Sequence, residues 1–267
     1  MKNRLSYALA AFLGIVAPAS AQNLDEVAQV QVIPGWSTTS GKHIAGLRIT
    51  LAPGWKTYWR APGDAGIPPV LNLERSSNIA GVELTWPVPT VFDQGGMRSI
   101  GYESGVVVPV TVTPRDAAAP KVLAGELQIG VCEEICIPMI FAFEATLPDS
   151  SQRDPAIIAS LLDQPMPAED AGVTRAVCRM VPSDLGMTLT AELDLPPTGG
   201  HEHVVIEAGD PYIWVSEPDT IRQGGTLSAT VDLVHTEYDS FAIERANVRI
   251  TVLGTERAVD VQGCQAG

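Results

Sequence analysis

The sequence predicts an all-β protein with two β-sandwich domains, joined by a linker that contains a short helix. Three observations favour this fold class. Short runs in which Val, Ile, Leu and Thr alternate with polar residues recur along the chain. The 21 Pro and 24 Gly residues separate these runs, as turn residues do in sandwiches. The length of 267 residues is more than one sandwich needs and suits two domains of ordinary size.

The N-terminus predicts a signal peptide over residues 1–21. Lys2 and Arg4 precede a short apolar run, and Ala19-Ser20-Ala21 has the small-x-small pattern of a cleavage site. The apolar run is too short for a stable membrane span. We therefore expect a periplasmic mature protein that starts at Gln22 and is not embedded in a membrane. Disulfides persist in the periplasm, so the four cysteines need to be explained.

The charge excludes one class of partner. The formal net charge is −14, and it becomes two units more negative once the expected signal peptide is removed. The chain contains no basic cluster. An acidic surface of this kind repels nucleic acid and anionic lipid. We expect no nucleic-acid partner, and the charge favours a basic protein partner.

The strand-like runs fall into two groups. In the first domain, residues 22–148, they are Val27–Val32, Ile44–Leu51, Val106–Thr113, Val122–Val131 and Ile140–Leu147. In the second domain, residues 172–267, they are Thr174–Val181, Met187–Leu195, Val204–Glu207, Leu227–Val234, Asn247–Leu253 and Ala258–Val261. The linker between them, residues 149–171, has a different composition. Asp154 is a good N-cap and Pro155 suits the first helical position, which predicts a short helix there.

Cys132 and Cys136 are separated by three residues and lie between two strand-like runs. An extended chain would hold their Cα atoms about 13 Å apart, whereas a disulfide needs roughly 4.4–6.8 Å. The chain must therefore turn between them, and facing positions at the end of a hairpin have the right separation. From the residues alone, three roles stay open: redox exchange, a structural disulfide and a metal site.

The residues around this pair are expected to modulate it. Glu133 and Glu134 lie between the sulfurs, and carboxylates near a thiol disfavour its thiolate. This favours a pair that is unreactive until a partner docks against it. Pro138 stiffens the chain after Cys136 and lacks an amide proton.

The other two cysteines have a different pattern. Cys178 and Cys264 lie near the beginning and the end of the second domain. A bridge between them closes a long loop, which constrains the unfolded chain strongly. We expect this pair to form a structural disulfide.

Two further segments have alternative interpretations. His201 and His203 are spaced by two residues, which suits either a copper site or an exposed turn. The aromatic-rich segment 54–60 suits either core packing or an exposed binding platform. The chain contains no nucleophile elbow, nucleotide-binding loop or EF-hand. We expect no cofactor and assign no metal site.

Several motifs together resemble a known family. They are Gly54–Arg60, Pro62–Pro68, Trp86–Pro89, Gly101–Glu103 and the Cys132/Cys136 pair followed by Ile137-Pro138. In this order they resemble the N-terminal periplasmic domain of the DsbD disulfide-reductase family, especially its ScsB-like branch. The resemblance covers residues 25–148, and residues 172–264 resemble the second sandwich of that branch more loosely.

The resemblance implies an immunoglobulin-like domain and a thiol–disulfide oxidoreductase of the protein-disulfide-reductase type. It implies that Cys132 and Cys136 receive electrons and pass them to periplasmic thioredoxin-like proteins, in processes such as cytochrome c biogenesis or copper tolerance. It also implies a cap loop that shields the pair. The matching stretch is residues 92–98, with Phe92 and Met97 as its bulky apolar residues, and Tyr58 matches a tyrosine placed beside the pair.

The chain departs from the family in two respects. Its cysteines are closer in sequence than in the best-known members, and it has neither a membrane domain nor a thioredoxin domain. We therefore expect the electron donor to be a separate membrane thiol transporter. Two alternative functions stay open. One is a non-catalytic periplasmic binding or chaperone-like module with two structural disulfides. The other is a copper-binding protein that uses Cys132 and Cys136, with or without His201 and His203.

Overall fold

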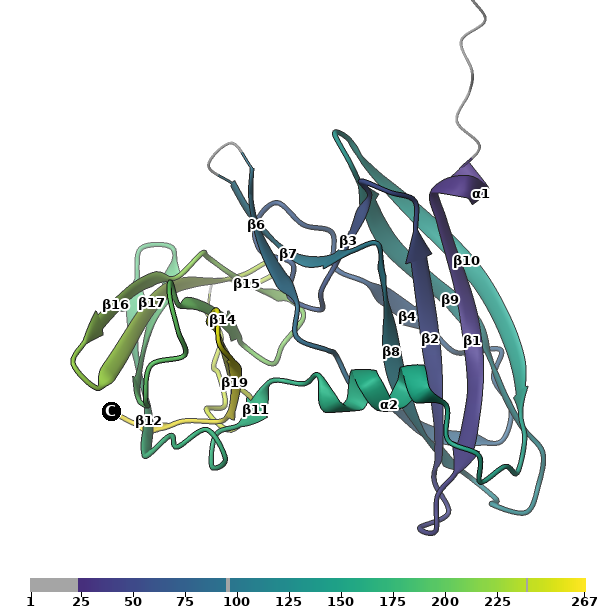
Figure 1. Ribbon diagram of the computed structural model, residues 1–267. Coiled ribbons are helices and arrows are strands. Elements are labelled where there is room, and N and C mark those ends of the chain that lie inside the picture. The colour runs from purple at the N-terminus through teal and green to yellow at the C-terminus, as the bar shows by residue number, and fades with distance from the viewer. Residues whose placement is uncertain (1–23, 95–96, 239) are drawn as a thin grey trace, which may run out of the picture.

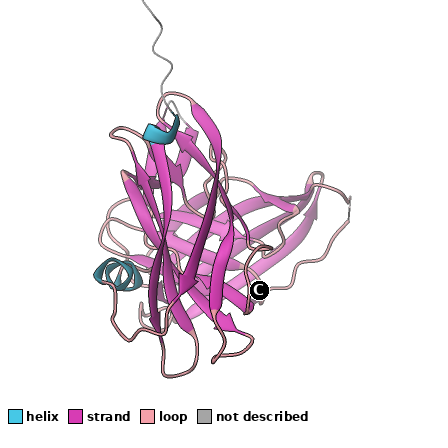
Figure 2. Cartoon of the chain, turned by 90° about the vertical axis from the view of Figure 1, so that its right-hand side faces the viewer, coloured by secondary structure: helices cyan, strands magenta, loops and turns pink. Residues whose placement is uncertain are grey.

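The computed structural model describes residues 24–94, 97–238 and 240–267 (Figure 1). The expected signal peptide lies outside the described residues, as do Gly95 and Gly96 of the expected cap loop. Strands make up most of the chain, and they form two sandwiches that lie side by side with helix α2 alongside (Figures 1 and 2). The all-β prediction is confirmed. None of the described helices is long and apolar enough to cross a membrane.

The first sandwich contains two antiparallel sheets, preceded by the short helix α1 (Leu24–Val27). Its strands are β1 (Ala28–Ser37), β2 (His43–Leu51), β3 (Lys56–Tyr58), β4 (Val70–Asn72), β5 (Ile79–Leu84), β6 (Thr90–Gln94), β7 (Met97–Glu103), β8 (Gly105–Pro114), β9 (Lys121–Cys132) and β10 (Cys136–Leu147). One sheet has the order β1-β2-β8-β5. The other has the order β10-β9-β3-β7-β6, with β4 also paired to β9.

The alternation of inward-facing apolar residues with outward-facing residues along the strands creates the core of this sandwich. Leu47, Ile49 and Leu51 on β2 are buried, and they pack in one cluster with Ile129 and Val131 on β9. Burying one such side chain contributes about 1.5–3 kcal/mol. The pattern with period two that predicted these strands therefore also fixes which face of each strand points inward.

The linker contains the predicted helix, α2 (Pro155–Leu162). The Asp154 side chain accepts hydrogen bonds from the amides of Ala156 and Ile157, so it caps the N-terminus as its position suggested. Ile157 is fully buried against Ile33 and its neighbours, and this contact holds the helix on the first sandwich.

The second sandwich also contains two sheets, with the orders β11-β19-β18-β14 and β15-β17-β13-β12-β20, where β16 also pairs with β17. Its strands are β11 (Met166–Pro167), β12 (Arg175–Ser183), β13 (Gly186–Asp194), β14 (His203–Glu207), β15 (Ile213–Val215), β16 (Asp219–Gln223), β17 (Thr226–His235), β18 (Arg249–Leu253), β19 (Ala258–Gln262) and β20 (Gln265–Ala266). Strand β11 lies within the expected linker and pairs in parallel with β19. The second sandwich therefore already begins inside that segment.

A disulfide joins Cys178 to Cys264, across a sequence separation of 86. Cys178 lies on β12 and is fully buried. Cys264 lies between β19 and β20, not on the last strand-like run of the sequence, because that strand ends at Gln262. The bridge therefore ties the C-terminal segment to the first long strand of the second sandwich.

The two sandwiches share a buried apolar contact. Trp59, Ile100 and Tyr102 of the first sandwich form one cluster with Val205, Leu253 and Ala258 of the second. Of these six side chains, Trp59 is fully buried. The two domains are therefore packed against each other on β7 and at the residue that follows β3.

Replacing both Cys178 and Cys264 by Ser should lower the free energy of unfolding by roughly 4 kcal/mol, because the bridge closes a long loop in the unfolded chain. The matched control is Cys132→Ser with Cys136→Ser, which opens a much shorter loop and should cost only about 2 kcal/mol. Urea unfolding of both double variants measures the difference. Equal losses would contradict this assignment of roles.

Candidate redox site

The candidate site lies at the end of the β9–β10 hairpin. Cys132 is the last residue of β9, Cys136 is the first of β10, and the two face each other in the strand register. Their Cα atoms are 4.2 Å apart and their sulfurs are joined in a disulfide. The turn between them consists of Glu133, Glu134 and Ile135. The hairpin therefore places both sulfurs at one corner of the sheet.

The two cysteines differ in exposure. Cys132 is 1% exposed, whereas Cys136 is exposed at the edge of the sheet. Strand β10 is an edge strand, because β9 is its partner on one side and the sheet ends there. A thiol of another protein therefore reaches Cys136 more easily than Cys132.

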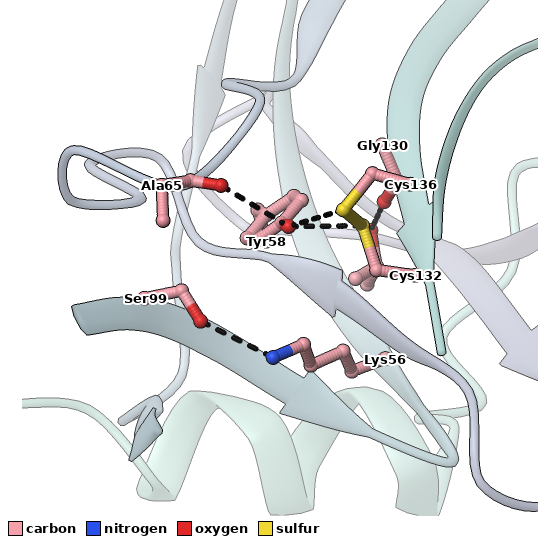
Figure 3. The surroundings of a disulfide bond; sticks show 8 residues. Lys56, Tyr58, Ala65, Ser99, Gly130, Cys132 and Cys136 are labelled. Carbon is pink, nitrogen blue, oxygen red and sulfur yellow. Dashed lines mark hydrogen bonds between the residues drawn. A yellow bond between two sulfur atoms is a disulfide. The ribbon is translucent and has the colours of Figure 1, made fainter. Parts of the chain in front are cut away.

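The Tyr58 hydroxyl contacts both sulfurs (Figure 3). Its oxygen lies 2.9 Å from Cys132 Sγ and 3.1 Å from Cys136 Sγ. The ring lies in a slot between two glycines. A Cβ on Gly130 would lie 2.9 Å from ring carbons of Tyr58, and one on Gly66 would lie 3.0 Å from the ring. Side chains at these two positions would push the ring out of the slot.

Burial raises the pKa of the Tyr58 phenol, so the hydroxyl stays protonated at neutral pH. It has one proton to donate, and the acceptors around it are the two sulfurs and the Ala65 carbonyl at 3.4 Å. A thiolate accepts a hydrogen bond far better than a disulfide sulfur does. The tyrosine is therefore placed to stabilise the reduced pair.

Strand β3 holds this tyrosine against the hairpin. The Thr57 hydroxyl donates to the Gly130 carbonyl at 2.9 Å, which fixes β3 to β9. The Lys56 ammonium donates to Ser99 Oγ at 3.3 Å and lies 4.8 Å from the centre of the Phe92 ring. Burial lowers the pKa of Lys56, and the Glu103 carboxylate opposes this shift. The sequence motif contained Lys56, but only the strand register shows that it faces Cys132.

This part of the chain also matches a protein family. Residues 23–148 match the family model described as "Thiol:disulfide interchange protein DsbD, N-terminal". This segment is a DsbD N-terminal-type domain. The chain thus contains a thiol–disulfide interchange domain with a cysteine pair, and the resemblance seen in the sequence is confirmed.

Solved structures extend the comparison beyond this domain. The N-terminal periplasmic domain of ScsB from Proteus mirabilis is 22% identical, with a TM-score of 0.69; the alignment covers 92% of this chain and 97% of that one. This likeness shows that both sandwiches share the fold of that domain. A Porphyromonas gingivalis W83 protein of unknown function is 12% identical over 90% of this chain and 98% of its own, but its TM-score of 0.23 is too low to support an argument. Among curated proteins, no sequence matches this chain.

The expected cap of this DsbD domain corresponds to the β6–β7 hairpin. Phe92 on β6 is half-buried beneath the Lys56 ammonium, whereas Met97 at the start of β7 is 64% exposed. Ser99, which faces Phe92 in the register, accepts the Lys56 hydrogen bond. The hairpin is therefore linked to Cys132 through Lys56, and shielding of the sulfurs by Phe92 or Met97 stays a prediction.

Around Cys136 the DsbD domain presents apolar residues beside acidic ones. Ile135 is 68% exposed at the tip of the β9–β10 hairpin. Ile140 on β10 and Val70 on β4 are also exposed, and both are strand partners of Gln128 on β9. Glu133 and Glu134 are exposed in the turn. Pro138 lies on the edge strand β10, where a missing amide proton is tolerated.

The alternative sites lie elsewhere. His203 begins β14 and His201 precedes it, with ring centres 4.5 Å apart. Within the described residues, no group of three or more His, Cys, Asp or Glu side chains is arranged to hold a metal ion. Trp55 and Trp59 are both buried, so the exposed-platform interpretation of this aromatic segment was wrong. Trp55 packs in the core of the first sandwich and Trp59 packs between the two sandwiches.

Replacing Tyr58 by Phe should raise the pKa of the Cys136 thiol by about one unit, because a hydrogen bond to a charged group contributes about 1.5–3 kcal/mol. The Cys132→Ser background leaves Cys136 as the one unpaired thiol, and its alkylation rate as a function of pH gives the pKa. Tyr212→Phe, at an exposed tyrosine of the second sandwich, is the matched control. An unchanged profile in Tyr58→Phe would show that the phenol does not stabilise the thiolate.

Proposed function

We propose that this protein relays electrons in the periplasm, receiving them from a separate membrane thiol transporter and passing them to thioredoxin-like partners through Cys132 and Cys136. One observation carries the proposal. Within a DsbD-family domain, a protonated phenol lies within hydrogen-bonding distance of both sulfurs of a disulfide whose second cysteine is exposed. A purely structural bridge has no need of such a donor.

The reductive half of the cycle starts from the disulfide. A thiolate of the donor attacks Cys136 Sγ, the Cys132–Cys136 bond breaks, and Cys132 leaves as a thiolate. Tyr58, 2.9 Å from Cys132 Sγ, stabilises that leaving group by donating its hydrogen bond. A second donor thiol then displaces Cys136 from the mixed disulfide. The donor is oxidised to a disulfide, and the pair takes up two electrons and two protons.

The oxidative half reverses the roles. The Cys136 thiolate attacks a disulfide of the acceptor and releases one acceptor thiol. Buried Cys132 then attacks Cys136 Sγ in the mixed disulfide, which restores the bridge and releases the reduced acceptor. Cys136 is assigned as the attacking residue because it is the more exposed of the two. A β6–β7 cap that opens only when a partner docks would limit oxidation of the reduced cysteine pair by other molecules.

The surface around Cys136 supports a protein partner. Its exposed side chains include the apolar Ile135 and Ile140 and the carboxylates of Glu133 and Glu134. A partner with an apolar surface around its own cysteine and basic residues at the edge would complement it. Small anionic disulfides would instead be repelled.

The deciding experiment is the reduction potential of the Cys132–Cys136 pair in the full chain, read by thiol alkylation in dithiothreitol or glutathione buffers. A value in the range of exchange proteins, roughly −270 to −120 mV, supports the relay. A value below about −300 mV marks a structural disulfide and favours the non-catalytic binding module instead.

Cys132→Ser should accumulate a mixed disulfide with a thioredoxin-like protein, because Cys136 can attack but the resolving thiol is missing. Cys136→Ser should accumulate at least tenfold less, because its remaining thiol is buried. Non-reducing gel electrophoresis after incubation with an oxidised thioredoxin measures both products. Equal trapping by the two variants would overturn the assignment of Cys136 as the attacking residue.

Replacing both Glu133 and Glu134 by Gln should speed the reaction of the reduced protein with oxidised glutathione about three- to tenfold at low salt, because the carboxylates repel this anion and disfavour the thiolate. Glu126→Gln with Glu144→Gln, at exposed positions farther along the same hairpin, is the matched control. The gain should shrink at 1 M salt, where charges are screened within about 3 Å. A gain that is independent of salt would contradict this electrostatic explanation.

A further inference from the structure

We propose that the second sandwich positions Tyr58 against the sulfurs. It does so through a clamp, in which Glu207 and Thr251 of the second sandwich hold Arg60, two residues after Tyr58. This inference rests on the proposed function, and it assigns the second domain a part in setting the redox properties of the pair. Arg60 and Glu207 are positioning residues, since neither is bonded to a sulfur and both act through Tyr58.

The strand that carries Tyr58 needs such an anchor. Strand β3 pairs with β9 at Lys56 and Thr57, and the register between the two strands stops there. Tyr58 follows at the end of β3, where its remaining strand partner is Gly101 on β7. Besides the slot that encloses its ring, the position of its hydroxyl therefore also depends on what holds the chain immediately after it.

The next residue is held in the domain interface. The Trp59 ring is fully buried in the cluster that includes Val205, Leu253 and Ala258 of the second sandwich. Its backbone amide donates to the Ile100 carbonyl at 2.9 Å. Tyr58 and Trp59 thus make contacts in different places, the first with the disulfide and the second with the neighbouring domain.

Arg60 completes the clamp. Its Nε lies 3.2 Å from both Glu207 carboxylate oxygens, and its Nη2 lies 3.0 Å from Oε2 and 3.1 Å from Thr251 Oγ1. The guanidinium also stacks on the Trp59 ring, 3.8 Å from its centre. The side chain is 12% exposed, so these groups replace most of its water.

The far side of the clamp is rigid. Glu207, Thr251 and Asp260 lie on β14, β18 and β19, three adjacent strands of one sheet. Asp260 is held by two hydrogen bonds from Arg249, of 2.7 and 2.9 Å, and it accepts a third from Thr251 at 3.3 Å. A guanidinium that makes several hydrogen bonds in one plane has one favoured orientation. Arg60 therefore fixes the backbone next to Tyr58 relative to this sheet.

The test compares Glu207→Gln with Tyr58→Phe in the full chain, by the dithiol–disulfide equilibrium of the Cys132–Cys136 pair with dithiothreitol. Tyr58→Phe should shift this equilibrium about tenfold toward the disulfide, which corresponds to about 30 mV for two electrons. Glu207→Gln should shift it three- to tenfold in the same direction. In the Tyr58→Phe background, Glu207→Gln should cause no further shift in the equilibrium, because Glu207 acts by positioning the Tyr58 hydroxyl, which this background lacks.

The matched control is Glu217→Gln. It removes a different ion pair between the domains, the one with Arg98 on β7, and should leave the equilibrium unchanged. If Glu207→Gln does not fold, as judged by its unfolding transition, Thr251→Val tests the same clamp. It removes the hydrogen bond from Arg60 together with the one to Asp260, and a shift of about twofold is expected.

Three results would overturn the clamp: an unchanged equilibrium in the folded clamp variants, a full additional shift in the Tyr58→Phe background, or an equal shift in Glu217→Gln. The proposed function can fail separately. A pair that never exchanges with thioredoxin still has a measurable equilibrium with dithiothreitol, and that equilibrium still reports whether Glu207 acts through Tyr58.

Discussion

The register of the β9–β10 hairpin is the constraint on which the site depends. With Cys132 opposite Cys136, Gly130 faces Pro138 and leaves room for the Tyr58 ring, while Ile129 and Val131 face the core. A slip of one residue in β9 would turn those apolar side chains onto the face that Tyr58 covers and a cysteine into the core. Burial of the core thus holds the sulfurs in place, and the chemistry of the site follows from packing on the opposite face of the same strand.

Features with a strong local signal could be predicted from the sequence. The long strands, the capped helix after Asp154 and the turn between Cys132 and Cys136 each follow from a few adjacent residues. Apolar–polar alternation in strands, helix capping and the short Cα separation of a disulfide each depend on residues close in the sequence. They can therefore be recognised before the fold is known. Tyr58 was assigned to the site through the family motif, and its two sulfur contacts are a property of the folded chain.

Features that depend on distant partners could not be predicted. Trp55 and Trp59 look equivalent in the sequence, yet one packs in the first sandwich and the other in the domain interface with residues near position 250. The short strands β3, β11 and β15 have too few residues to show alternation. The sequence does not show that Arg60 and Lys56 are largely buried, and only their placement in the fold does. In each case the missing information is which element covers the residue.

The burial of Cys178 has a consequence for how this protein matures. Four cysteines allow three ways of forming two bridges. In the unfolded chain, closure of a loop between near neighbours is entropically easiest, so Cys132 and Cys136 are the pair most readily joined. Once they are joined, the remaining two cysteines have one pairing left, and folding of the second sandwich encloses Cys178 beyond the reach of thiols in solution. Oxidative maturation is thereby simplified, and thiol–disulfide exchange at the exposed Cys136 leaves the enclosed bridge intact.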